Sequence, residues 1–164
     1  MKEQGSVTTR YSLHGDGDGD APTLIVGPVE DDCGPDPVFD QFPWPAHRLR
    51  NRLEVALHLH VSHACVVVCE RDLPGCDWKD VLEVTASSPN PPPVIVTSRL
   101  ADEYLWSEVI NLGGFDVLAK PLDKQEVSRV LNFAWEHWAD RAYPAERPKA
   151  APVQKGDLAK CSTA

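Results

Sequence analysis

The sequence has no apolar run of the roughly 18 to 20 residues that a membrane-spanning helix needs. Its N-terminal residues 1–13 are polar and lack the apolar stretch of a secretory signal. Positive charge is also in short supply, because 16 Lys and Arg stand against 25 Asp and Glu, a net charge of −9. A chain this acidic repels a polyphosphate backbone. We therefore expect a cytoplasmic protein that binds neither a membrane nor nucleic acid.

Signatures of cofactor and metal sites are missing as well. No Gly-x-Gly-x-x-Gly loop follows the first predicted strand, and the Gly-Asp repeat at 15–20 lacks the Glu of a calcium loop. His58, His60, His63 and Cys65 are close in sequence, but His58 and His60 lie on different faces of a predicted helix, whereas zinc needs converging ligands. We expect no cofactor and no metal.

Cysteines are few and odd in number, five in 164 residues. Cys65 and Cys69 flank an apolar run, as small buried hydrophobic residues do. Free thiols in a reducing compartment are the expectation.

Hydrophobic residues make up 42% and charged residues 25% of the chain, which is typical of a globular protein with a buried core. We predict one domain over residues 23–142. Residues 1–22, with the Gly-Asp repeat, and residues 143–164, rich in Ala, Pro and Lys, have little to bury and are predicted to be flexible arms.

Strand and helix patterns alternate within that domain. Continuous apolar runs typical of buried strands lie at Thr23–Val26, 65–69, 93–97 and 115–119. Helical spacing of apolar residues occupies 50–60, 78–85, 102–112 and 123–138, with Asp102 and Asp123 as expected N-caps. Leu53 and Leu57 share one helical face, and Leu112 extends the stripe of the third helix. The alternation predicts a doubly wound α/β domain with a parallel sheet.

The stretch 29–47 fits this pattern poorly, because prolines and a glycine interrupt it. We expect only an irregular first helix there, followed by an edge strand within 44–49.

Polar side chains lie where three predicted strands end. Glu70, Thr97 and Lys120 bring a carboxylate, a hydroxyl and an ammonium group to the carboxyl edge of the sheet, which is where open α/β sheets carry their sites.

Three motifs in order carry a family resemblance: Cys-Glu-Arg-Asp-Leu-Pro-Gly at 69–75, Val-Ile-Val-Thr-Ser at 94–98 and Val-Leu-Ala-Lys-Pro at 117–121. Together they resemble the response-regulator receiver domain of two-component signalling, over residues 23–142. The resemblance implies a flavodoxin-like, five-stranded parallel sheet with strand order 2-1-3-4-5. It also implies the family's chemistry, in which an Asp accepts a phosphoryl group beside a magnesium ion.

Thr97 and Lys120 match the family's hydroxyl and lysine positions, but the remaining site positions depart from the pattern. Glu70 stands in place of the phospho-acceptor Asp, and Gly27 and Pro28 replace the acidic pair that would hold the metal. The resemblance therefore implies a receiver that has kept the fold without the phosphorylation switch. Glu70 is expected to pair permanently with Lys120 and to imitate part of the charge of the phosphorylated state.

We therefore expect an atypical, stand-alone receiver without enzyme activity that acts as a phosphorylation-independent protein-interaction module in bacterial signal transduction. The resemblance implies a histidine kinase, another regulator or a second copy as partner, bound through the family's fourth helix, fifth strand and fifth helix. Tyr104, Trp106 and Ile110 would contribute to that interface, unless they pack on the sheet instead.

Two other interpretations stay open at the level of sequence. One is a phosphorylatable receiver that uses Asp72; Glu30, Asp31 and Asp32 are a separate candidate for a metal site. The other is a flavodoxin-like enzyme or metal-binding protein that uses Glu70, Thr97 and Lys120.

Overall fold

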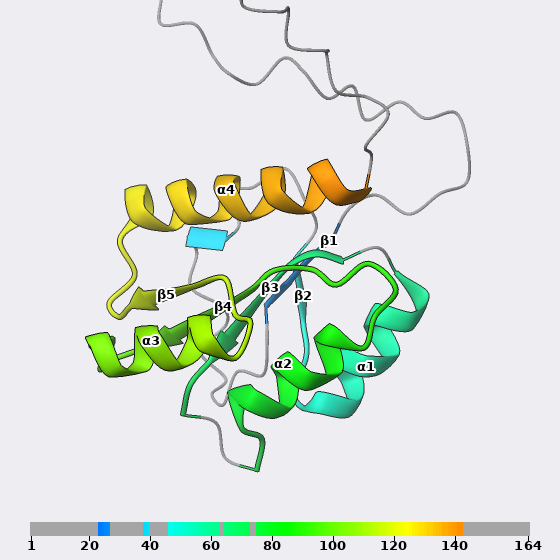
Figure 1. Ribbon diagram of the computed structural model, residues 1–164, viewed down its shortest axis with the longest axis horizontal. Helices are drawn as coiled ribbons and strands as arrows, with labels where there is room; N and C mark the ends of the chain where they lie inside the picture. The colour runs from blue at the N-terminus through cyan, green and yellow to red at the C-terminus, as the bar shows by residue number, and fades with distance from the viewer. Residues whose placement is uncertain (1–22, 27–37, 40–45, 63, 73–74, 143–164) are drawn as a thin grey trace, which may run out of the picture.

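The computed structural model describes residues 23–26, 38–39, 46–62, 64–72 and 75–142. Within these residues a parallel sheet has the strand order β2-β1-β3-β4-β5 (Figure 1). Its strands are β1 (Thr23–Val26), β2 (Ala46–Arg48), β3 (Ala64–Glu70), β4 (Val94–Ser98) and β5 (Asp116–Ala119). The expected α/β fold with a parallel sheet is confirmed. The predicted arms at 1–22 and 143–164 lie outside the described residues.

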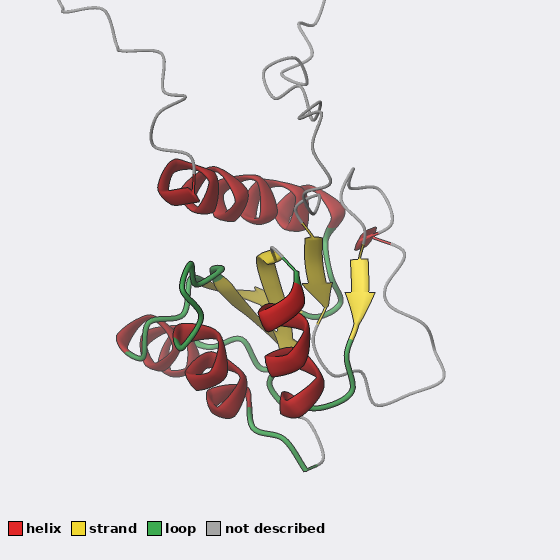
Figure 2. Ribbon diagram, turned by 90° about the vertical axis from the view of Figure 1, so that its right-hand side faces the viewer, coloured by secondary structure: helices red, strands yellow, loops and turns green. Residues whose placement is uncertain are grey.

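Helices cover both faces of the sheet. Helix α4 (Lys124–Ala142) lies across one face, and α1 (Arg52–Val61), α2 (Trp78–Ala86) and α3 (Glu103–Asn111) lie on the other (Figures 1 and 2). Alternate residues of β3 therefore enter different cores. Val66 and Val68 pack with Leu131 and Trp138 of α4, whereas Val67 and Cys69 pack with the three opposite helices. This double coverage explains why residues 64–69 are all buried.

Register places the strand ends side by side. Glu70 of β3 is the partner of Thr97 in β4, and Ser98 of β4 is the partner of Ala119 in β5. Because all these pairings are parallel, the residues that end each strand gather at one edge of the sheet.

Side-chain caps begin the helices where the sequence suggested. Asp102 accepts from the Leu105 N–H at 2.8 Å, and Asp123 accepts from the Glu126 N–H at 2.9 Å. The sequence analysis missed a complete capping box at α2, where Asp77 and Asp80 bond reciprocally to each other's backbone. Helix α3 ends at Asn111 with Leu112 as its C-cap, and the next residue, Gly113, has a φ of 93°, in the left-handed region that favours glycine.

Two apolar faces turn out differently from what periodicity suggested. Helix α1 buries Val55, so Leu53 and Leu57 on the shared face point to solvent instead. Leu112, which would have extended the α3 stripe, caps that helix and is exposed. The pattern alone did not reveal which side of α1 meets the sheet.

The irregular stretch is only partly described. An edge strand within 44–49 is confirmed as β2, the last strand on its side of the sheet. The predicted irregular first helix falls mostly on residues outside the described part of the chain, where only Val38 and Phe39 are placed, with Phe39 buried in the α4 core. Among the described helices, none is long and apolar enough to cross a bilayer.

Candidate functional site

The candidate site lies at the carboxyl edge of β3, β4 and β5. Glu70 is the last residue of β3, Thr97 lies one residue before the end of β4, and Lys120 directly follows β5. These are the three positions that the sequence analysis singled out, and the structure brings all three together.

Two donors converge on one carboxylate oxygen. The Lys120 ammonium group and the Thr97 hydroxyl, at 3.1 Å, both donate to Oε2 of Glu70. The Thr97 Oγ1 also lies 3.5 Å from the Cys69 carbonyl oxygen, but a hydroxyl has one proton, and the shorter contact to Glu70 takes it. The expected contact between Glu70 and Lys120 is therefore present.

Burial makes this contact more consequential than a surface ion pair. The Glu70 side chain is 20% exposed and the Lys120 side chain 35% exposed, and Thr97 is buried. Charges that are partly withdrawn from water interact more strongly, and a carboxylate left without its donors in such a place would be costly. Each member of the trio therefore helps hold the others in place.

The arrangement favours a stable carboxylate over a reactive one. An ammonium and a hydroxyl that both donate to Oε2 stabilise the negative charge there and reduce the oxygen's tendency to attack an electrophile. Neither Lys120 nor Thr97 has a second carboxylate beside it that would act as a base among the contacts of the described residues. The trio resembles a structural pairing more than an acid–base couple.

A divalent cation does not fit the donor set. Gly27 and Pro28, which the motif resemblance places at the family's metal-ligand positions, lie outside the described residues, and neither residue type has a side-chain oxygen. Over the described ranges, His, Cys, Asp and Glu form no group of three or more able to hold a metal. The Glu70 carboxylate already accepts from Lys120 and Thr97.

Other candidate residues stand apart from the trio. Asp72 is exposed, and its carboxylate lies 3.8 Å from Nε of Arg71 rather than beside Lys120. The His58 ring packs against the His47 ring at 4.5 Å. Glu30, Asp31, Asp32 and His63 lie outside the described residues.

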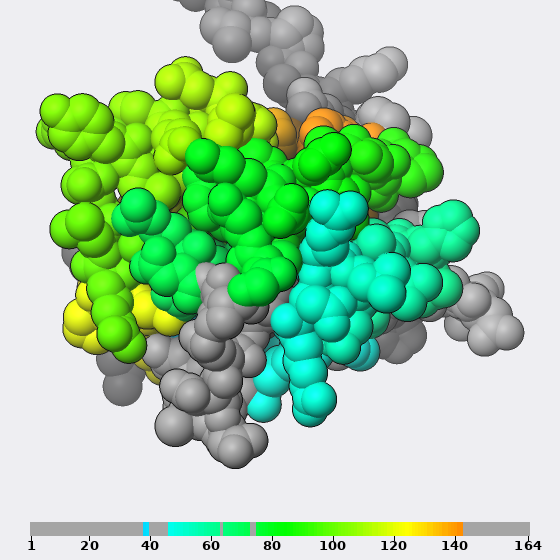
Figure 3. Space-filling view, turned by 90° about the horizontal axis from the view of Figure 1, so that it is seen from below, coloured from blue at the N-terminus to red at the C-terminus, as the bar shows by residue number. Residues whose placement is uncertain are grey.

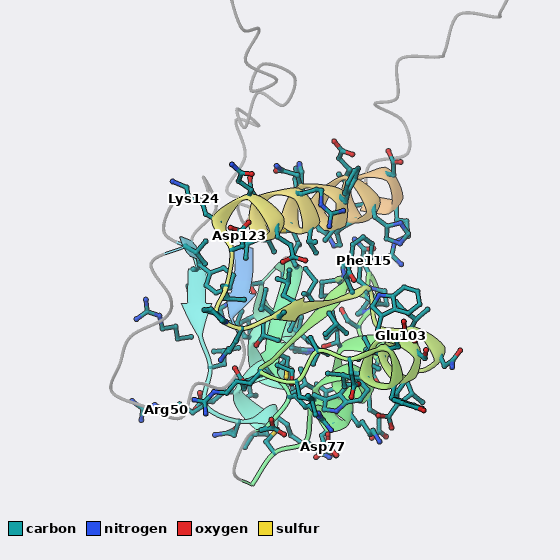
Figure 4. All side chains as sticks on the ribbon, turned by 90° about the vertical axis from the view of Figure 1, so that its left-hand side faces the viewer. Arg50, Asp77, Glu103, Phe115, Asp123 and Lys124 are labelled. Carbon is teal, nitrogen blue, oxygen red and sulfur yellow. The ribbon has the colours of Figure 1, made fainter. Side chains whose placement is uncertain are left out.

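The aromatic residues of α3 face solvent. Tyr104 is 87% exposed and Trp106 51% exposed, and Ile110 is also exposed, so the interpretation that they pack on the sheet is wrong. Figure 4 looks onto this side of the molecule, with Glu103 marking the start of α3 and its side chains projecting outward. The Trp106 Nε1–H donates to Oδ1 of Asp116 in β5 at 3.2 Å, which joins α3 to the edge strand. Nothing in the sequence pattern pointed to this bond.

Among the described residues, Cys65 and Cys69 are buried thiols that form no disulfide, as expected, and so is Cys76. Burial raises the pKa of the Cys65 thiol to about 12 and also raises the pKa of the Cys69 and Cys76 thiols.

Because the thiolate is the reactive form, a Cys33→Ser/Cys161→Ser variant, which keeps only these three cysteines, is expected to resist alkylation by iodoacetamide near neutral pH. Unfolding in urea should expose all three thiols, and intact mass would count the labels. Stability should fall as the pH rises from the ordinary thiol pKa of 9.0 toward 12, since only the unfolded chain then loses the Cys65 proton. Rapid labelling of the folded protein would contradict the assigned burial.

Comparison with known proteins identifies the fold. No protein-family model and no curated protein matches the chain. Among solved structures, the receiver domain of a Francisella response regulator is 20% identical, with 71% of this chain and 98% of that chain covered and a TM-score of 0.61. The receiver domain of an HD domain-containing protein from Pseudomonas fluorescens is 22% identical, with 73% and 98% covered and a TM-score of 0.63.

A third similar structure is the magnesium-bound receiver domain of a sensor histidine kinase from Pseudomonas aeruginosa. It is 15% identical, with 71% of this chain and 99% of that chain covered and a TM-score of 0.60. This chain therefore has the fold of response-regulator receiver domains, as its motifs implied.

Proposed function

We propose that this protein is a receiver-fold interaction module of signal transduction whose carboxylate site works without phosphorylation. One observation carries the proposal: Oε2 of Glu70 accepts from both Lys120 and Thr97. In this interpretation the Glu70 carboxylate takes the place that a phosphoryl oxygen would occupy beside those two donors. The site would then hold one permanent arrangement, and the protein would act by binding other proteins rather than as an enzyme.

Geometry and charge both argue against phosphoryl transfer at Glu70. Glutamate carries its carboxylate one methylene further from the backbone than aspartate, and a misplacement on the order of 1 Å can cost about a hundredfold in rate. Without acidic side chains at positions 27 and 28, no metal would neutralise the charge of the transferred group.

Treatment with acetyl phosphate and magnesium is therefore expected to leave the intact mass unchanged, in the wild type and in a Glu70→Asp variant alike. A phosphorylatable receiver treated in parallel is the positive control. Robust modification of Glu70→Asp would show that the missing metal ligands do not matter. Modification of the wild type that an Asp72→Asn variant abolishes would identify Asp72 as the acceptor and contradict the proposal.

The flavodoxin-like enzyme or metal-binding protein is the second candidate. No contact of the described residues favours it over the interaction module. Flavin absorbance or a stoichiometric metal in the purified protein would favour it instead, and would contradict a purely binding role for the trio.

The partner surface in this proposal is the α3–β5–α4 face, represented by Tyr104, Trp106 and Ile110. Exposed aromatic side chains are common at the centres of protein interfaces. A histidine kinase, another regulator or a second copy would bind there.

If the partner is a second copy, light scattering after size exclusion should give a dimer mass that Trp106→Ala shifts toward the monomer. Truncating Trp106 and its bond to Asp116 should weaken the association about tenfold or more. Leu53→Ala, which removes an exposed apolar side chain of α1 away from the α3–β5–α4 face, is the matched control. A dimer that Trp106→Ala leaves intact would remove the α3–β5–α4 face as the contact surface.

A further inference from the structure

An apolar stripe runs along the outer side of α1. Leu53, Leu57 and Val61 follow each other at intervals of four residues and are 64%, 60% and 72% exposed. Residues at this spacing lie one above the other on a helix, so the stripe spans roughly 12 Å. Single exposed aliphatic residues are ordinary, but three in a row form a continuous patch of the kind that marks interaction sites.

Three arginines lie between the end of β2 and the first residue of α1, at the N-terminal end of this stripe. Arg48, Arg50 and Arg52 are all exposed, and Arg52 lies 3.5 Å from Asp80 of α2. Over the described part of the chain, no carboxylate forms an ion pair with the guanidinium group of Arg48 or Arg50. The nearby Glu54 carboxylate accepts instead from the Arg50 backbone N–H at 2.6 Å. In Figure 3 residues 46–61, in cyan, form one continuous surface beside α2.

We propose that this surface, the α1 face defined by Arg48, Arg50, Leu53, Leu57 and Val61, docks an acidic amphipathic helix of another protein. Apolar residues of that helix would cover the stripe, and its carboxylates would meet the two arginines. A stripe of this length matches the anchors that an amphipathic helix presents over two to three turns.

Charge selects this partner over other occupants. Residues 46–61 hold three arginines against one glutamate, a local net charge of +2, whereas the whole chain carries −9. A second copy is disfavoured because its arginines would face the same arginines, and because both chains carry a net negative charge and repel each other. An anionic bilayer would be repelled by the rest of the molecule for the same reason. An acidic segment of a different protein is favoured instead, because its negative charge is complementary to the local positive charge.

The α1 face is independent of the α3–β5–α4 face. Strands β2 and β5 form opposite ends of the sheet, and Figure 2 views the molecule from the β2 end, with α1 in front. Failure of one surface in an experiment would therefore leave the other untouched.

Binding of a labelled peptide tests the proposal with the full-length chain. The probe is an amphipathic helix of about 18 residues, five turns, with leucines along one face and glutamates beside them. Fluorescence anisotropy should show saturable binding that weakens about fivefold or more in an Arg48→Glu/Arg50→Glu variant, and by a similar factor in Leu57→Ser. Raising the salt from about 0.1 M to 1 M should weaken binding as well, because the screening length shortens.

Matched controls lie on α4, across the sheet. Arg129→Glu reverses an exposed charge there and Phe133→Ser removes an exposed apolar side chain, and both should bind the peptide like the wild type. Equal binding of a peptide with lysines in place of the glutamates would overturn the proposal. Unchanged binding by the Arg48→Glu/Arg50→Glu variant, or no binding at all, would overturn it too. Self-association abolished by Leu57→Ser, or recruitment to vesicles of phosphatidylglycerol through this face, would also overturn it by identifying a different occupant.

Discussion

Replacing Trp138 with alanine is expected to lower the free energy of unfolding by about 3 to 5 kcal/mol. Trp138 is among the largest fully buried side chains, and its ring stacks on that of Trp135 at 5.4 Å between centroids. It fills the core between α4 and the sheet together with Val66 and Leu131. Truncation would leave a cavity that the surrounding strands close only in part, so transfer and cavity costs add.

Chemical denaturation followed by far-UV circular dichroism would measure this loss. Phe133→Ala, on the exposed side of the same helix, is the matched control and should cost less than about 1 kcal/mol. Equal losses in the two variants would mean that α4 is not docked on the sheet through its Trp138 face.

Replacing Lys120 with methionine is expected to cost about 1 to 3 kcal/mol, because it leaves the Glu70 carboxylate without its cation in a partly buried place. Glu70→Gln should cost less. Its amide oxygen still accepts from Thr97, and the more exposed Lys120 ammonium group can turn to water. A Glu70→Gln/Lys120→Met double variant should therefore be more stable than Lys120→Met alone.

Denaturation of the four proteins completes a double-mutant cycle for the pair. The exposed contact between Lys79 and Glu108, 2.5 Å long, provides the control, and Lys79→Met should leave stability essentially unchanged because solvent screens that pair. Strictly additive effects of Glu70→Gln and Lys120→Met would show that the two side chains do not interact in solution.

Much of the fold follows from local patterns. The valine run at 65–69 is predicted as a strand because it is apolar on both sides, and in the structure both of its faces are covered. The apolar spacing from Val127 to Trp138 predicts the buried side of α4, and these residues are buried there. In both cases the residue types predict burial directly, because nearly all of these side chains are apolar and must be buried however the strand or helix packs.

Patterns were less informative where an element has two plausible apolar sides. Helix α1 carries apolar residues on more than one side, so Leu53 and Leu57 appeared to form its buried face, although Val55 is the residue that meets the core. Likewise, the sequence pattern was equally consistent with Tyr104 and Trp106 packing on the sheet and with their exposure to solvent. Their exposure is decided by how α3 lies on β4 and β5, which is a property of the assembled layers.

The amino-acid sequence by itself determined the alternation of strands and helices, the caps at Asp102 and Asp123, and the identity of the polar residues that end three strands. Only the tertiary structure decided that Lys120 and Thr97 donate to the same oxygen of Glu70, and that Leu53, Leu57 and Val61 form a stripe open to solvent. The physical reason is the sequence separation over which each interaction acts. Periodicity and capping act over three or four residues, whereas the Glu70 contacts join residues 27 and 50 positions apart, and the chain finds them only when the register of the sheet is set.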